Sequence, residues 1–155
     1  MPPMTSLACI VAMCTALASQ QPMSKQSRAT LVKSCVALSK YTQANTDADV
    51  LTIAAIAYTE SGFRHTVVSS AGAKGILQVL PKYWCKKGKL AKCDYLKAGL
   101  RAWRYYRTRS PTLRDALCSY ASGRPCGSGT TRATRYADTV LRRINLGAAS
   151  CPSGC

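Results

Sequence analysis

Glutamate, histidine and phenylalanine each occur only once in this chain of 155 residues, as Glu60, His65 and Phe63. Acidic side chains are scarce altogether, since 6 Asp and Glu face 22 Lys and Arg. A site assembled from several glutamates or histidines is therefore excluded. The three unique residues all fall in residues 58–81, which have the sequence YTESGFRHTVVSSAGAKGILQVLP.

The sequence also lacks the spacing of a zinc site. Such sites combine cysteine pairs two to four residues apart with histidines. There is no CxxC pair, and His65 stands apart from every pair of cysteines. We therefore expect no metal ion and no cofactor, and we interpret His65 as a solvated loop residue.

The shortage of acids gives a formal net charge of +16, spread along the chain rather than gathered in one tail. Such a charge attracts polyanions, whether nucleic acid, an anionic cell envelope or an acidic membrane surface, or it serves only as a hydrated surface. The hydrophobic content of 47% is typical of a globular protein. The length is enough for one domain with one core.

Cysteine, in contrast, is abundant, with nine residues. Heavy use of cysteine is typical of oxidising compartments, although buried free thiols are the alternative. Connectivity does not follow from sequence, and the odd count leaves at least one cysteine unpaired or bonded to another chain. The spacing suggests three short disulfide-closed loops, between Cys85 and Cys93, Cys118 and Cys126, and Cys151 and Cys155.

An apolar stretch at residues 1–22 has two interpretations. It resembles a secretory leader, with an apolar run of about a dozen residues and a cleavage pattern at residues 16–18 (ALA). No basic residue precedes the run, which is unusual for a leader. The alternative is an apolar helix that docks into a partner protein. In either case the run is too short to span a bilayer.

The rest of the chain predicts helices with few strand signals. Apolar residues at helical spacing indicate a helix over residues 27–41. A nearly uninterrupted apolar helix follows, capped by Thr46 or Asp47 and ended by Gly62 just past Glu60. Three more helices are predicted from apolar residues that share one helical face. The first contains Leu96, Leu100 and Trp103. The second starts at Ser110-Pro111 and contains Leu113, Leu117 and Tyr120, and the third contains Tyr136, Val140 and Ile144 and ends at Gly147.

Glu60 is expected at the C-terminal end of this buried helix. Desolvation and the negative end of the helix dipole both favour a protonated carboxyl there. A protonated glutamate is what general acid catalysis requires. A surface glutamate at a frayed helix end is the alternative when the residue is taken alone.

The segment that begins at Glu60 resembles the catalytic segment of the soluble lytic transglycosylase (SLT) family, relatives of goose-type lysozyme. The family pattern is roughly E-S-x-F-N-P-x-A-V-S-x-x-G-A-x-G-L-M-Q-x-M-P. Two later segments, ALCSYASG and TRYADTVLRR, are similar to the family's A-Y-N-A-G and Y-V-x-x-V-L segments. The residues in register in the first segment are Glu60, Ser61, Phe63, Val68, Ser69, Gly72, Ala73, Gly75, Gln78 and Pro81.

This resemblance implies a mainly α, lysozyme-like single domain over residues 23–147, with an irregular loop region after the catalytic helix. The cysteine spacing adds disulfide staples to this domain and a short cysteine-containing tail at 148–155. It also implies cleavage of the β-1,4 bond between N-acetylmuramic acid and N-acetylglucosamine in peptidoglycan. Glu60 is the implied general acid, and then the base that helps to close a 1,6-anhydro ring. The implied substrate-binding residues are Ser61, Ser69, Gln78, Tyr120 and Tyr136.

Several positions that bear on sugar binding depart from the family pattern. The family's Asn-Pro after Phe is replaced by Arg64 and His65, the Met after Gln by Leu80, and the Asn of A-Y-N by Ala121. The segment CKKGKLAKC replaces a short helical continuation and is expected to form a basic loop closed by a disulfide.

Three functions remain open on the sequence. The first is a transglycosylase that acts outside the cytoplasm, either secreted or periplasmic, or carried by a phage tail or an envelope-spanning secretion machine whose other proteins are its partners. The second is a hydrolase of the same fold, in which Asp47 or Asp49 recruits water. The third is a basic, non-enzymatic virion protein that binds nucleic acid, which is a less favoured partner than peptidoglycan.

Overall fold

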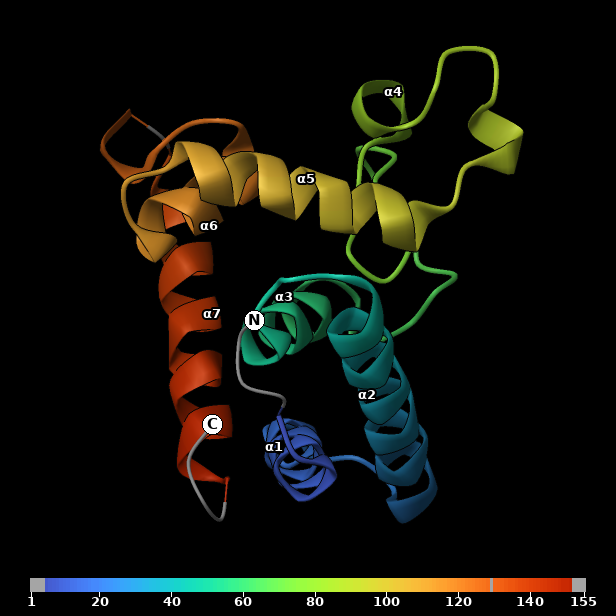
Figure 1. Ribbon diagram of the computed structural model, residues 1–155, viewed down its shortest axis with the longest axis vertical. Coiled ribbons are helices and arrows are strands. Elements are labelled where there is room, and N and C mark those ends of the chain that lie inside the picture. The colour runs from blue at the N-terminus through green and yellow to red at the C-terminus, as the bar shows by residue number, and fades with distance from the viewer. Residues whose placement is uncertain (1–4, 129, 152–155) are drawn as a thin grey trace. The chain divides into compact units, whose positions relative to one another are not determined.

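The computed structural model describes residues 5–128 and 130–151, and these ranges contain helices and no strand (Figure 1). The predicted mainly α fold class is therefore confirmed. Two compact units divide the chain. The first consists of Met1–Phe63 together with Arg142–Cys155, and the second of Arg64–Leu141.

The first unit begins with helix α1 (Leu7–Ala18), capped by the Ser6 hydroxyl, which accepts a hydrogen bond from the Cys9 N–H at 3.2 Å. This is the apolar segment that resembles a leader. Half of its residues are buried, and the helix packs against α2 and α3 of the same unit. The buried residues are Cys9, Ile10, Met13, Cys14, Leu17 and Ala18.

Two disulfides tie α1 to the rest of the first unit. Cys14 is bonded to Cys35 on α2, and Cys9 to Cys151, 142 residues further along the chain. The expected bond between Cys151 and Cys155 is therefore wrong for Cys151, because a contact between the two ends of the chain leaves no local sequence signal. Cys155 lies outside the described residues.

Helix α2 (Lys25–Asn45) is longer than predicted, and α3 (Val50–Ser61) is the buried apolar helix that precedes the irregular loop. Its cap is Asp49, whose Oδ2 accepts hydrogen bonds from the Thr52 N–H at 2.9 Å and the Thr52 hydroxyl at 2.6 Å. The predicted cap, Thr46 or Asp47, is therefore wrong. Gly62 ends the helix in a left-handed conformation, as expected.

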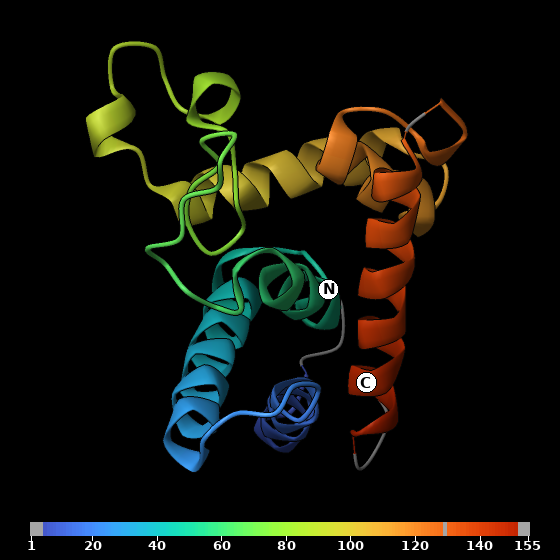
Figure 2. The ribbon, with the colours of Figure 1, turned by 180° about the vertical axis from the view of Figure 1, so that it is seen from behind.

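The second unit holds an irregular loop over residues 64–80 and then a series of short and long helices (Figure 2). The loop is held together by two isolated bridges, Val68 with Lys74 and Lys74 with Val79. The helices are α4 (Pro81–Trp84), the 3-10 turn η1 (Leu90–Lys92), α5 (Tyr95–Arg109), α6 (Leu113–Ser122), the 3-10 turn η2 (Cys126–Ser128) and α7 (Thr131–Ala149), whose last eight residues belong to the first unit.

Helix α6 starts later than the Ser110-Pro111 pair predicts. Ser110 is instead the residue after α5, and Thr112 caps α6 by accepting the Asp115 N–H at 3.0 Å. The Thr112 hydroxyl also donates to Asp115 Oδ2 at 2.7 Å, so the two side chains close the first turn together. This reciprocal pair outweighs the preference for Pro in the first helical turn.

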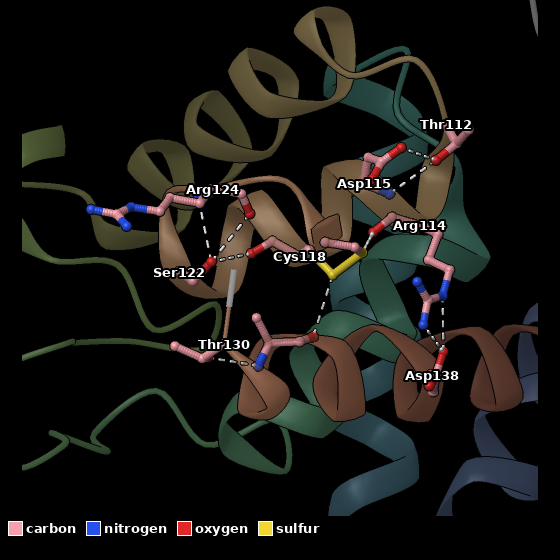
Figure 3. Close-up of a disulfide and its surroundings, with 10 residues drawn as sticks. Thr112, Arg114, Asp115, Cys118, Ser122, Arg124, Thr130 and Asp138 are labelled. Atoms are coloured by element: carbon pink, nitrogen blue, oxygen red, sulfur yellow. Dashed lines mark hydrogen bonds and ion pairs between the residues drawn. A yellow bond between two sulfur atoms is a disulfide. The ribbon is translucent and has the colours of Figure 1, made fainter. Parts of the chain in front are cut away.

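A disulfide and an ion pair fasten the surroundings of α6 (Figure 3). Cys118 is bonded to Cys126, and Cys85 to Cys93, so the structure forms both of these loops. Arg114 on α6 forms a salt bridge of 3.1 Å with Asp138 on α7. The salt bridge links α6 to the first half of α7, and the Cys118–Cys126 disulfide links α6 to η2.

Gly147 does not end the last helix, which continues to Ala149. The residue is buried against Met13 and Leu51 of the first unit. Its small size at this contact explains the glycine better than a helix stop does. Among the described residues, no helix is both long and apolar enough to cross a bilayer.

Candidate functional site

Glu60 is the penultimate residue of α3, and its side chain is only partly exposed. The chain turns sharply after it, because Gly62 and Phe63 both have positive φ values, 59° and 63°. That conformation costs a residue with a Cβ roughly 1 to 2 kcal/mol. The buried Phe63 ring, 5.9 Å from the Tyr58 ring, offsets this cost and fixes the exit from the helix.

Arg143 of α7 reinforces the same turn of α3 within the first unit. Its Nη1 donates a hydrogen bond of 2.7 Å to the Thr59 hydroxyl. Its guanidinium also lies over the Tyr58 ring, 4.5 Å from the centroid. A cation is thus anchored on the two residues that precede Glu60. Nothing in the sequence marks Arg143, because one basic residue does not stand out in a chain with 22 Lys and Arg.

Ser61 follows Glu60 on α3 but is 3% exposed. Its hydroxyl donates to the Ala57 carbonyl at 3.1 Å, as a buried serine in a helix commonly does. This position suits a role in holding the end of α3 better than a direct contact with a sugar.

The loop of the second unit contains Ser69 and Gln78, two residues predicted to bind substrate. The Ser69 hydroxyl accepts the Ala73 N–H at 3.0 Å, so it stabilises the tight turn at Gly72. Gln78 Nε2 donates to the carbonyls of Val67 and Gly75, both at 2.9 Å. Both amide hydrogens are therefore used inside the loop, and the Oε1 oxygen is the atom of Gln78 suited to a substrate donor.

Tyr120 on α6 is half-buried and is connected to the same loop. Its hydroxyl donates a hydrogen bond of 2.6 Å to the carbonyl of Leu77, next to Gln78. Its ring contacts Trp103 and Tyr106 edge-on, with centroids 6.0 and 6.3 Å apart. Burial raises the pKa of the Tyr106 phenol in this cluster above its ordinary value. The polar tip of Tyr120 thus positions the loop.

Tyr136 lies on α7 in the part that belongs to the second unit, and its hydroxyl is buried. His65 is exposed, as predicted for a solvated loop residue.

Most of the other acidic side chains have structural roles. Asp49 and Asp94 cap α3 and α5, and Asp94 Oδ1 accepts the Lys97 N–H at 3.0 Å. Asp115 closes the first turn of α6, and Asp138 pairs with Arg114. Glu60 stands out as the acid at the C-terminal end of a helix, where the helix dipole disfavours a charged carboxylate.

A comparison with protein-family models finds the same family that the segment around Glu60 resembles. The family model "Transglycosylase SLT domain" matches residues 37–130, which is more than half of the chain. The chain belongs to the transglycosylase SLT family. No curated protein and no solved structure matches it. The matched range of this SLT protein includes Glu60, Ser69, Gln78 and Tyr120, whereas Tyr136 lies beyond it.

Proposed function

We propose that this SLT protein is a peptidoglycan lytic transglycosylase that cleaves the MurNAc-β-1,4-GlcNAc bond and leaves a 1,6-anhydro end, with Glu60 as the catalytic residue. The carboxyl of Glu60 gives its proton to the glycosidic oxygen as the bond to muramyl C1 breaks. The resulting carboxylate takes the proton of the muramyl 6-hydroxyl, whose oxygen bonds to C1. Both protons are accounted for, and no water is consumed.

The separation of Asp49 from Glu60 is the observation that carries this proposal. Glycosidases that use water in an inverting reaction need a second carboxylate about 6.5 to 9.5 Å from the acid. Asp49 and Glu60 lie at opposite ends of α3, 11 residues apart. At 1.5 Å per residue this separates them by roughly 16 Å along the helix. Asp49 is also committed to its cap, so ring closure by the substrate is the simpler chemistry.

The test compares Glu60→Gln with Asp49→Asn on purified sacculi. Gln keeps the shape of Glu60 but supplies no proton, so we expect muropeptide release to fall by at least about a hundredfold. Asn is as good a cap as Asp, so Asp49→Asn should keep its activity. Mass spectrometry of the products should show anhydro ends. Reducing ends, with activity lost in Asp49→Asn, would instead establish the hydrolase.

We place the protein outside the cytoplasm, where peptidoglycan lies and where disulfides persist. Four disulfides in the described residues, tying together segments far apart and close in sequence, support this placement. A role in local wall penetration by a phage tail or a secretion machine remains our proposal. Its test is whether the protein co-purifies with assembled particles.

Residues 1–22 are proposed to stay in the mature chain. The support is the two disulfides and the buried face that α1 presents to the first unit. A processed chain that starts after Ala18 would lose two of the four bonds. Intact-mass measurement of the exported protein decides between a retained and a removed segment.

A further inference from the structure

The positive charge of this protein is concentrated in the second unit. That unit has 16 Lys and Arg against 3 Asp, a net charge of +13. The first unit has 6 Lys and Arg against 3 acids, a net charge of +3. A hydrated surface needs no such imbalance, because scattered charges of both signs serve solubility equally well.

The loop between Cys85 and Cys93 carries the densest part of this charge. Its seven enclosed residues include four lysines, all exposed, and no acid. None of the four forms an ion pair within the described part of the chain. They are Lys86, Lys87, Lys89 and Lys92.

The loop, which we call the lysine loop (residues 85–93), is braced at its base. The Cys85–Cys93 disulfide closes it, and the Arg101 Nη2 donates a hydrogen bond of 2.8 Å to the carbonyl of Trp84, just before it. The Trp84 ring packs edge-on against Tyr105 of α5, at 5.5 Å. Figure 2 shows the loop extending from α4 before the chain enters α5. Four charges are thus presented on a restrained backbone, which lowers the entropy lost on binding.

The basic surface continues along α5. Lys97, Arg101 and Arg104 are exposed at i, i+4 and i+7 and therefore lie on one face of the helix. The apolar face of the same helix, which includes Trp103, is buried. Apart from Leu90 in the loop and the rings of Tyr83 and Tyr105, which are exposed, the surface offers charge and no continuous apolar face, unlike a helix that inserts into a bilayer.

Exposed aromatic rings near the loop already have cations of their own. Lys82 Nζ lies 4.8 Å from the centroid of the Tyr83 ring, which is 68% exposed. The Arg109 guanidinium lies 4.0 Å from the centroid of Tyr105. Proteins that bind single-stranded nucleic acid stack successive bases on such rings. Because a cation already lies over both rings, we take the ligand of the lysine loop to be an anionic polymer without bases.

We infer that the lysine loop is a second substrate-binding site, which holds the carboxylates of the peptide stems of peptidoglycan by charge. The inference rests on the proposed function, because peptidoglycan is the polyanion that this family meets. Lysine is a compact and flexible point cation, suited to scattered carboxylates rather than to one planar group. Attraction to the loop would raise the local concentration of glycan strands without taking part in bond cleavage.

The test measures binding apart from cleavage, with the full disulfide-bonded chain carrying Glu60→Gln. The ligand is purified peptidoglycan stripped of secondary polymers, with its carboxylates either free or amidated. The loop variant replaces Lys86, Lys87, Lys89 and Lys92 with Gln. The control replaces four exposed bases of the first unit with Gln, which gives the same net charge: Lys25, Arg28, Lys33 and Lys40.

We expect the loop variant to bind free-carboxylate peptidoglycan about tenfold more weakly, from four exposed ion pairs, and with a smaller dependence on salt. The control variant should bind free-carboxylate peptidoglycan within about twofold of the parent. The parent should bind amidated peptidoglycan no more tightly than the loop variant binds peptidoglycan with free carboxylates. Equal binding by the loop and control variants would overturn the inference, as would full binding to amidated peptidoglycan. A single-stranded oligonucleotide that binds more tightly than peptidoglycan would also overturn it, in favour of nucleic acid. Muropeptide release is measured separately with the chain that keeps Glu60. A failure of the proposed catalytic function is therefore distinguished from a failure of binding by the lysine loop.

Discussion

Gly99→Ala is expected to destabilise the second unit, although alanine is the better helix former. Gly99 lies inside α5, where a Cβ would come 2.6 Å from Leu77 Cβ and 2.8 Å from its Cδ1. Carbon atoms normally pack at about 3.5 to 4.0 Å, so roughly 1 Å of movement is needed. The atom in the way is a Cβ, which cannot move without its backbone.

Two opposing terms set the size of this effect. Alanine in place of glycine gains about 1 kcal/mol of helix propensity. Overpacking a filled core costs typically about 1 to 3 kcal/mol. We therefore expect a net loss of about 1 kcal/mol in the free energy of unfolding. The melting temperature should fall by about 2 to 4 °C, as measured by circular dichroism.

Gly147→Ala is the matched control, because Gly147 also lies inside a helix. Its nearest neighbour would be Met13 Cγ, at 2.9 Å, in the middle of a side chain with three rotatable bonds. We expect Gly147→Ala to be neutral or to stabilise by up to about 1 kcal/mol. The reasoning is refuted if Gly99→Ala is as stable as Gly147→Ala. Activity gives a second readout. In Gly99→Ala the displaced Leu77 should shift the neighbouring Gln78 and its turn, whereas Gly147→Ala should leave that turn in place.

Three further predictions concern the site and its supports. Gly75→Ala should cost about 2 to 3 kcal/mol in the free energy of unfolding, because φ is 82° and a Cβ would lie 2.8 Å from the Cβ of Tyr95, the first residue of α5. Gly72→Ala, at φ 85° but with open space around it, should cost only about 1 to 2 kcal/mol, as measured by urea denaturation. Arg143→Met should slow muropeptide release and lower the free energy of unfolding by about 1 to 2 kcal/mol, because it removes the contacts with Thr59 and Tyr58. Arg143→Lys should recover part of both. Unchanged kinetics in Arg143→Met would show that the turn before Glu60 needs no support from Arg143. Removing the bond between Cys14 and Cys35 by double alanine substitution should cost about 3 kcal/mol for a loop of 21 residues, and a thermal melt unchanged by the substitution would contradict this.

The sequence predicts local features of this protein well. The end of α3 at Gly62 and the buried character of that helix follow from composition and spacing, which act over a few residues. The start of the same helix is harder, because NTDAD offers several capping residues in a row. Only the path of the chain into the helix decides that Asp49 is used.

Contacts between distant segments could not be predicted from one sequence. The bond from Cys9 to Cys151 and the contact of Gly147 with Met13 join residues more than a hundred positions apart. The roles of Arg143 and of the Tyr120 hydroxyl depend on contacts of the same kind. No linker in the composition marks the boundary between the two units.

The bond between Cys9 and Cys151 gives the protein an order of assembly. Cys9 leaves the ribosome long before Cys151, and the bond cannot close until Cys151, 142 positions further along the chain, has been made. Thiol buffers in a reducing compartment keep both sulfurs reduced. On the proposed placement outside the cytoplasm, the bond would therefore close only after the chain has left the cell's interior, and the proposed wall cleavage would be separated in time from synthesis.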